Sequence, residues 1–178
     1  FDFLVTACAT CTSTIKKLWP TLAQLTNAEQ GLVAELAGKT VDISQLLVDQ
    51  LGVTAASAAA SPNAVAVTYH DPCHLKTSLG VAAQPRTLIR ANGRYRFKEM
   101  QESDCCCGCG GSFNLQHYDI SRAIGRRKRE NIAQSGCSVV ATGCPACMLQ
   151  LLDMQSQAGD RIAVKHAIEI YAESFASP

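Results

Sequence analysis

The chain has 178 residues, 47% of them hydrophobic, and a formal net charge of +1. This length allows one domain or one and a half, with enough apolar residues for a sizeable core. The small net charge argues against a general attraction to nucleic acid or anionic lipid, and no apolar run approaches the roughly 18 residues of a membrane span.

The first third of the chain predicts one short strand and three helices, followed by a linker rich in Ala and Ser. In chain order these segments are residues 3–5, 11–19, 27–37, 43–51 and 53–63. Pro20 interrupts the first helix because proline removes a backbone donor. Asp42 is placed to cap the third helix.

Beyond residue 63, strands and helices alternate. The predicted strands are residues 64–69, 95–100, 138–142 and 162–164, and the predicted helices are residues 85–91, 119–134, 144–157 and 167–175. A further helix is expected to start at Cys73, where the preceding Pro72 is tolerated. Residues 104–112 form a loop of glycine and cysteine. This alternation predicts an α/β fold, a mainly parallel β-sheet flanked by helices.

Ten cysteines are the unusual part of the composition, and five of them share one pattern. The pattern is C-x32-C-C-x36-C-x2-C and comprises Cys73, Cys106, Cys107, Cys144 and Cys147, here called the five-cysteine set. Cys73 and Cys144 each lie just beyond a predicted strand. Parallel strands end at one edge of a sheet, so the set is expected to converge at the C-terminal edge of the strands.

Converging thiolates suit a soft metal centre, and iron–sulfur chemistry in particular. Glycines at 108, 110 and 111 allow the backbone to approach a bulky inorganic core and to donate N–H groups to it. A secreted disulfide framework is disfavoured, because consecutive cysteines at 105–107 are poor disulfide partners for one another. The chain is also long enough to fold without stabilising disulfide bonds. A structural zinc site and thiol–disulfide exchange at a CxxC pair stay open.

Residues 3–11 and 139–147 form an internal repeat. Each copy reads as a strand, a small turn residue and a CxxC pair at a helix start, where the helix dipole should stabilise the first thiolate. We therefore expect residues 1–52 to be the tail of a truncated upstream repeat, 53–63 a linker, and 64–178 a complete domain. Cys8 and Cys11 would form an incomplete second site.

The functional interpretation of the other polar residues is less specific. His70 and His74 flank Cys73, and we expect hydrogen-bonded groups that shape the loop rather than metal ligands. The basic run at Arg122 and 126–129 predicts a solvated helix face, with a nucleic-acid patch or a docking surface for an acidic partner as alternatives. Cys137 is expected to be a small buried residue, and Cys105 and Cys109 to flank the site.

Several strings around these cysteines carry a family resemblance. They are Tyr69-His70-Asp71-Pro72-Cys73-His74-Leu75, Gln84-Pro85-Arg86, Cys106-Cys107-Gly108, Gly110-Gly111-Ser112-Phe113 and Thr142-Gly143-Cys144-Pro145. With them, residues 64–170 resemble the cysteine-rich CCG domain that occurs in heterodisulfide reductases and in the iron–sulfur subunits of glycolate and lactate oxidoreductases. Such proteins usually carry two copies of the domain, in agreement with the repeat.

The resemblance implies that the five-cysteine set holds a [4Fe–4S] cluster, in some members a non-cubane arrangement that uses all five cysteines. Zinc is the alternative in other copies, and a preparation exposed to air could lack the cluster. The resemblance also implies an electron-transfer subunit, inactive alone, that is similar to the partner of a flavin-dependent lactate or glycolate dehydrogenase. Its implied partners are that flavin-containing subunit and an electron acceptor. We expect no nucleic-acid partner and no membrane span.

The implied location is the cytoplasm or the inner face of the membrane. Two other functions stay open. One is a catalytic centre, like that of heterodisulfide reductase, which cleaves a disulfide at the cluster. The other is a zinc-stabilised interaction module without enzymatic activity.

Overall fold

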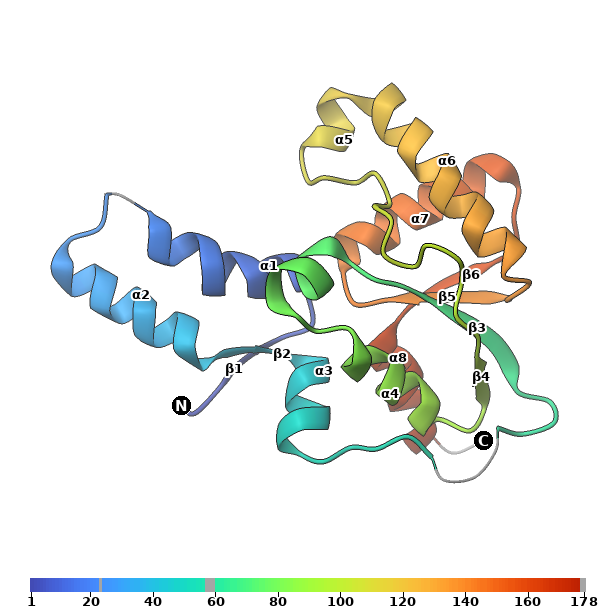
Figure 1. The fold of residues 1–178 in the computed structure, drawn as a ribbon, viewed down its shortest axis with the longest axis horizontal. Helices are drawn as coiled ribbons and strands as arrows, with labels where there is room; N and C mark the ends of the chain where they lie inside the picture. The colour runs from blue at the N-terminus through green and yellow to red at the C-terminus, as the bar shows by residue number, and fades with distance from the viewer. Residues whose placement is uncertain (23, 57–59, 177–178) are drawn as a thin grey trace.

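A computed structural model describes residues 1–22, 24–56 and 60–176. The main sheet has four strands in the order β4-β3-β5-β6, and every neighbouring pair is parallel. These strands are β3 (Val65–His70), β4 (Tyr95–Phe97), β5 (Val139–Thr142) and β6 (Ala163–His166). The parallel sheet and its covering helices confirm the predicted α/β fold (Figure 1).

Helices cover both faces of the main sheet (Figure 1). The helical segments of this part are η4 (His74–Ser78), α4 (Ala83–Ala91), α5 (Phe113–Gln116), α6 (Tyr118–Gln134), α7 (Pro145–Ala158), α8 (Ala167–Ala172) and η5 (Glu173–Phe175). Helices α6 and α7 lie on one face, and α4 and α8 lie on the other. No helix in the described ranges is both long and apolar enough to cross a bilayer.

Strand alternation divides the interior into two cores. Val67 and Tyr69 of β3 pack with Ile89 of α4 and Ile170 of α8. On the opposite face, Val140 of β5 packs in a second core that includes Leu151 of α7 and three of the cysteines. Because successive side chains of a strand point to opposite faces, the residue after Tyr69 is directed toward the cysteine side.

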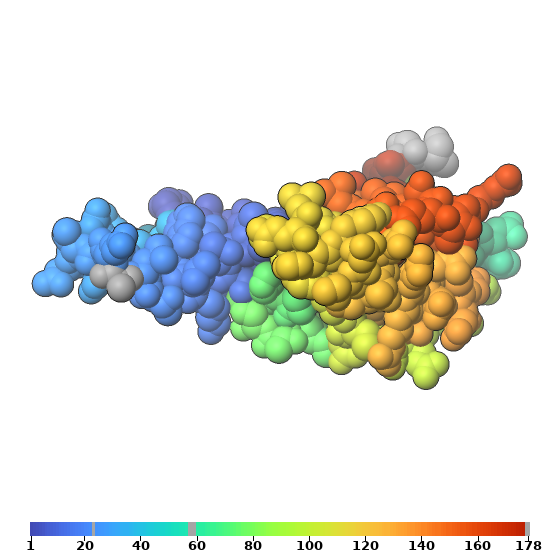
Figure 2. Space-filling model, turned by 90° about the horizontal axis from the view of Figure 1, so that it is seen from above, coloured from blue at the N-terminus to red at the C-terminus, as the bar shows by residue number. Residues whose placement is uncertain are grey.

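The N-terminal part has a separate parallel pair of strands, β1 (Leu4–Thr6) and β2 (Thr40–Asp42). Its helical segments are α1 (Ala9–Ser13), η1 (Thr14–Leu18), η2 (Trp19–Thr21), α2 (Asn27–Lys39), α3 (Ile43–Gln45) and η3 (Leu46–Gln50). The segments from α1 to α2 form the blue protrusion in Figures 1 and 2, whereas α3 lies beside α4. The carboxylate of Asp42 accepts from the backbone N–H of Ser44 at 2.9 Å, so the predicted cap is present.

Most differences from the predicted elements concern short segments. β2 and α5 have three and four residues and were not predicted, because a periodic pattern needs a longer window. The helix predicted to start at Cys11 begins at Ala9, and the edge strand predicted for residues 95–100 ends at Phe97. The predicted linker has no helix or strand among its described residues, and its residues 57–59 lie outside them.

Candidate metal centre

The five-cysteine set lines a single cavity, together with Thr10 and Cys109. Cys107, Cys144 and Cys147 are buried, whereas Cys73 and Cys106 are exposed. The buried thiols therefore form the floor of the cavity, and the exposed ones lie at its mouth. All ten cysteines of the chain are free thiols.

The ends of two neighbouring strands place two of these thiols. Strand β3 ends at His70, and Cys73 follows as the N-cap residue of η4. Strand β5 ends at Thr142, and Cys144 is the N-cap residue of α7. Since β3 and β5 are paired in parallel, both cysteines reach the same edge of the sheet, as the sequence predicted.

Gly143 joins β5 to α7 where there is no room for a side chain. A Cβ atom built there would lie 2.9 Å from the Leu75 side chain and 3.2 Å from the hydroxyl of Tyr69. Real Cβ atoms rarely approach their neighbours so closely. The glycine thus lets Cys144 sit directly against the end of the sheet.

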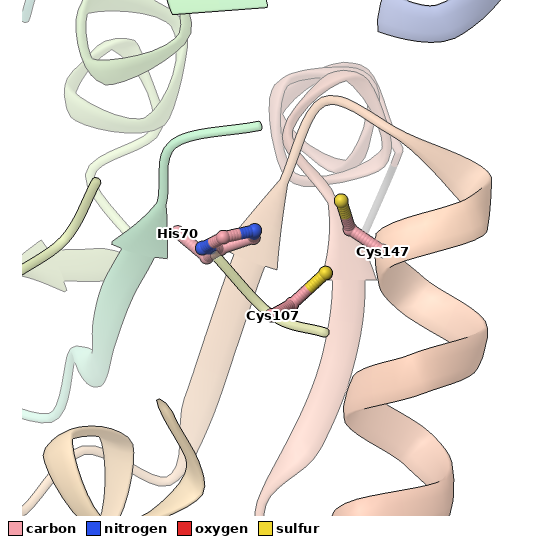
Figure 3. A group of neighbouring side chains, drawn as sticks. All are labelled: His70, Cys107 and Cys147. Carbon is pink, nitrogen blue, oxygen red and sulfur yellow. The ribbon is translucent and has the colours of Figure 1, made fainter. Parts of the chain in front are cut away.

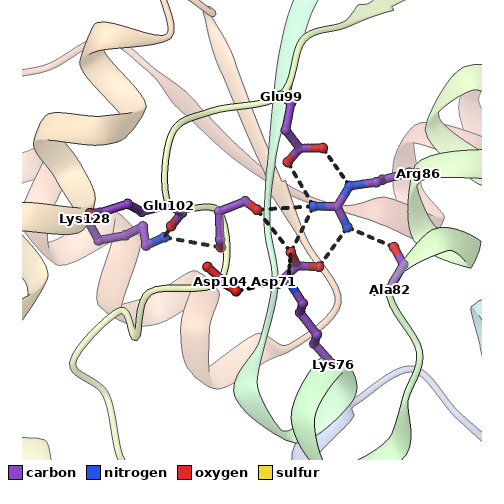
Figure 4. Close-up of polar contacts among 9 residues, drawn as sticks. Asp71, Lys76, Ala82, Arg86, Glu99, Glu102, Asp104 and Lys128 are labelled. Atoms are coloured by element: carbon purple, nitrogen blue, oxygen red, sulfur yellow. Dashed lines mark hydrogen bonds and ion pairs between the residues drawn. The ribbon is translucent and has the colours of Figure 1, made fainter.

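A network of charges around the buried carboxylate of Asp71 joins the loop that carries Cys73 to the loop that carries Cys106 and Cys107 (Figure 4). Arg86 of α4 donates to both carboxylate oxygens of Asp71 at 2.7 and 2.8 Å, and to both oxygens of Glu99 at 2.7 and 2.8 Å. The backbone N–H of Asp71 donates to the carbonyl oxygen of Ser103 at 2.9 Å. Bidentate pairs of this kind fix both distance and orientation.

Lys128 of α6 completes this network and is fully buried. Its ammonium group donates to the carbonyl oxygens of Glu102 and Ser103, just before the cysteine loop (Figure 4). Burial lowers the pKa of this lysine. The predicted solvated face was therefore wrong for Lys128, which shares the buried side of α6 with Gly125 and Ile132.

Hydrogen bonds among the thiols shift their pKa values in opposite directions. Bonds from Cys106 and Cys147 hold the pKa of Cys107 well below its usual range. The hydrogen bond from Cys147 lowers the pKa of Cys144 to about 4. The pKa values of Cys106 and Cys147 are raised, chiefly by their bonds to Cys107. A metal that binds this set must displace the remaining protons, so binding is expected to release protons.

The N-terminal CxxC pair lies outside the cavity lining. Cys8 accepts from the backbone N–H of Cys11 at 3.4 Å, but burial raises its pKa to about 11. The predicted thiolate stabilisation was therefore wrong for Cys8, because desolvation outweighs that backbone hydrogen bond. Between the two cysteines, the hydroxyl of Thr10 hydrogen-bonds with His74 Nδ1 at 3.1 Å and with the sulfur of Cys144 at 3.4 Å.

His70 was expected to be a hydrogen-bonded loop residue, and this expectation was wrong. The ring is buried, with 1% of its surface exposed, and neither ring nitrogen has a hydrogen-bond partner among the described residues. Figure 3 shows it facing Cys107 and Cys147, with one ring nitrogen and both sulfur atoms within 4.8 Å of one another. The only available sequence signal was strand alternation, which places His70 on the face opposite Tyr69.

The other flanking residues follow the predictions. Cys137 is buried. Cys109 lines the cavity, and Cys105 lines a groove beside Cys106. Arg127 and Arg129 form ion pairs with Glu102 and Asp160 at the surface of α6.

The family model of the CCG cysteine-rich domain matches residues 67–152, a range that contains the whole five-cysteine set. This part of the chain belongs to the CCG cysteine-rich domain family. The CCG domain contributes both loops and the α7 N-terminus, so all the thiols around the cavity come from the matched residues.

Several curated proteins are similar over most of the chain. One subunit of the fumarate reductase (CoM/CoB) of Methanothermobacter marburgensis is 31% identical over 89% of this chain and 29% of its own length. Lactate utilization protein A of Oceanobacillus iheyensis is 31% identical over 76% of this chain and 54% of its own length. One subunit of the dihydromethanophenazine:CoB–CoM heterodisulfide reductase of Methanosarcina barkeri is 30% identical over 94% of this chain and 39% of its own length. The chain thus spans about half or less of these relatives.

The residues of the CCG domain fit an iron–sulfur cluster. A cubane [4Fe–4S] cluster needs four thiolates, and six thiols line this cavity, those of the five-cysteine set and that of Cys109. The backbone N–H of Gly108 donates to the sulfur of Cys106 at 3.3 Å, the kind of bond that stabilises a sulfur ligand. The buried imidazole of His70 offers a further polar contact to a bound group.

Gly108 should tolerate substitution least among the loop glycines. Its φ is +94°, and an added Cβ would collide with the carbonyl oxygen of Ser121. We expect Gly108→Ala to lower the free energy of unfolding by more than the ~1–2 kcal/mol that a left-handed conformation costs alone. Gly111→Ala is the matched control, since its φ is +63° and its Cβ would meet open space. Equal losses in urea unfolding would contradict the role of the contact with Ser121.

Proposed function

We propose that this chain is an iron–sulfur-binding electron-transfer domain of an oxidoreductase subunit. The single observation that carries the proposal is the convergence of five thiols from three segments on one cavity within a CCG domain. Cys73, Cys106, Cys107, Cys144 and Cys147 are proposed as the residues that hold a [4Fe–4S] cluster, cubane or non-cubane. When bound, such a cluster supplies one-electron oxidation and reduction.

Other features of the site exclude water, leave access for a partner and hold the cysteine loops in place. The buried Cys107, Cys144 and Cys147 exclude water from the floor, while Cys73 and Cys106 leave one side of the site open to a partner. The Arg86–Asp71 pair and Lys128 fix the loops that carry these thiols. This arrangement supports electron transfer through the side of the site at Cys73 and Cys106. In this proposal the chain itself makes or breaks no bond of a substrate.

The proposed partners are a flavin-containing dehydrogenase subunit and an electron acceptor. The similarity to lactate utilization protein A supports a 2-hydroxy acid as the substrate of that flavin subunit. A location in the cytoplasm, or at the inner face of the membrane, is proposed, because thiols that converge on a metal site need a reducing compartment to stay reduced.

Residues 1–52 are proposed to be the closing part of a second CCG repeat. Strand β1, a CxxC pair, α1, β2 and α3 follow the same order as β5, a CxxC pair, α7, β6 and α8, except that η1, η2 and α2 lie between α1 and β2. Both strand pairs are parallel, and Thr6 pairs with Asp42 as Thr142 pairs with His166. In this proposal, Cys8 and Cys11 are two ligands of a second site, residues 53–63 are a linker, and residues 64–178 form the complete repeat.

Disulfide cleavage at the cluster is the second candidate. A groove lined by Cys105, Cys106, Ile120, Ile124 and Arg127 opens beside the exposed thiol of Cys106. Such a groove could hold an organic disulfide against that sulfur, and two of the similar proteins are named for reactions of CoM and CoB. Reduction of a disulfide by the reconstituted protein with an artificial electron donor would favour this candidate.

Anaerobic reconstitution followed by metal analysis tests the main proposal. We expect about four iron and four sulfide per chain at the complete site, with an EPR signal on reduction. One zinc per chain with no uptake of iron would overturn the electron-transfer function. That result would favour a zinc-stabilised interaction module, in which four Cys or His ligands suffice.

A further inference from the structure

His70 is a residue of the site to which the cysteine pattern assigns no role. It closes strand β3 and pairs in register with Thr142 of β5, so the paired backbone holds it in place. Its ring has 1% of its surface exposed and lies beside Cys107 and Cys147 (Figure 3). Buried polar side chains almost always have a hydrogen-bond partner, so one without any calls for an explanation.

The geometry directs the imidazole toward the cavity. One ring nitrogen lies within 4.8 Å of both sulfur atoms, and neither ring nitrogen has a hydrogen-bond partner among the described residues. Because neither ring nitrogen makes a hydrogen bond of ordinary geometry with these thiols, the ring can donate to a sulfur atom of a group bound between them. Every protonation form of imidazole found in proteins carries at least one N–H group.

We infer that His70 is a positioning residue that donates an N–H···S hydrogen bond to the bound iron–sulfur cluster and thereby raises its reduction potential. The inference rests on the proposed function. A donor beside the cluster stabilises the more negative, reduced form, since hydrogen bonds to sulfur are among the factors that set the potential of such clusters. Direct ligation by His70 is not required, because the five-cysteine set already lines the cavity.

Two substitutions at this position separate the hydrogen bond from the volume of the ring. His70→Leu fills the space with an apolar side chain and removes the donor, whereas His70→Asn keeps an N–H group. His117→Leu is the matched control, because that histidine is exposed and does not line the cavity. Each variant is reconstituted anaerobically, its iron content is measured, and its reduction potential is found by a titration followed by EPR.

We expect all variants to take up the same iron as the wild type. His70→Leu should shift the reduction equilibrium at least tenfold toward the oxidised form, which is about 59 mV for one electron. His70→Asn should recover most of the shift, and His117→Leu should leave the potential unchanged. In the wild type with ¹⁵N-labelled histidine, pulsed EPR should show weak nitrogen coupling through a hydrogen bond.

An unchanged potential in a fully loaded His70→Leu protein would overturn the inference and leave the proposed function intact. Strong coupling from an iron-bound nitrogen, or no nitrogen coupling at all, would overturn it as well. If His70→Leu does not fold, the nitrogen coupling in the wild-type spectrum and the reduction potential of the Asn variant still test the inference. A wild-type chain that takes up no iron would overturn the proposed function and this inference together.

Discussion

Replacement of Cys107 by serine is expected to lower iron incorporation at least roughly tenfold. Cys107 is buried at the floor of the cavity, and its sulfur lies within 4.8 Å of the sulfur of Cys147. Loss of an outer contact to a metal ligand already costs about 10- to 100-fold in affinity, and a directly bound thiolate should contribute no less. Iron and sulfide per chain after anaerobic reconstitution measure the effect.

Cys137→Ser is the matched control for this substitution. Cys137 is also buried, but its sulfur lies outside the cavity and contacts the carbonyl oxygen of Ser135, at 3.9 Å. The variant should retain the iron content of the wild type. Similar losses of iron in both variants would contradict the assignment of ligands and would indicate a general effect of removing a buried thiol.

Arg86→Met is expected to cost about 3 kcal/mol in the free energy of unfolding, the lower end of the ~3–5 kcal/mol for breaking one side of a buried ion pair. The substitution leaves the carboxylate of Asp71 buried, with 1% of its side chain exposed, and without its bidentate partner. The lower end applies here, because Lys76 Nζ lies 3.6 Å from Asp71 and Ser103 still donates to it at 3.1 Å. Urea unfolding measures the loss.

Arg127→Met is the control, since its pair with Glu102 leaves 65% of the arginine side chain exposed. Exposed pairs contribute about 0–1 kcal/mol, so a loss equal to that of Arg86→Met would refute the importance of burial.

The acid dependence of stability should change in the Arg86→Met variant. Burial raises the pKa of Asp71, but the hydrogen bonds and charge of Arg86 outweigh it, and the net pKa is below the ordinary value. Its contribution is therefore present above the ordinary aspartate pKa of about 3.9 and is lost as the pH falls through the lower folded value. Without Arg86 the folded pKa rises toward that of the unfolded chain, so this contribution shrinks. The free energy of unfolding of the variant should therefore fall less than that of the wild type as the pH is lowered below about 4, and urea unfolding at several pH values measures the difference.

The convergence of the cysteines was predictable because it depends on short-range order in the sequence. A strand followed at once by Cys73, and another followed by Cys144, can only deliver both thiols to one edge of a parallel sheet. The distance between them along the chain does not matter once the strands pair. Cys106 and Cys107 lie in a long loop without such a constraint, and only the cysteine pattern itself indicated their place.

The supporting residues were harder to predict, for two different reasons. Lys128 could have been found from helical spacing, since Ser121, Gly125 and Ile132 mark the buried face that includes it. His70 could not, because its lack of a partner depends on the pairing of β3 with β5 and on a thiol 77 positions later, Cys147. A pattern within one segment carries no information about which polar groups remain unpaired after folding.

The contact of Thr10 with the cavity has a thermodynamic consequence. Its hydroxyl hydrogen-bonds with the sulfur of Cys144, and its neighbour Ala9 donates a backbone N–H to the carbonyl oxygen of Gly143 at 3.1 Å. Occupancy at Cys8 and Cys11 would therefore act on the same short helix that borders the CCG cavity. Linkage is reciprocal, so any factor by which one site changes the affinity of the other must apply equally in the opposite direction. Loading of the two sites would then be coupled through one turn of helix.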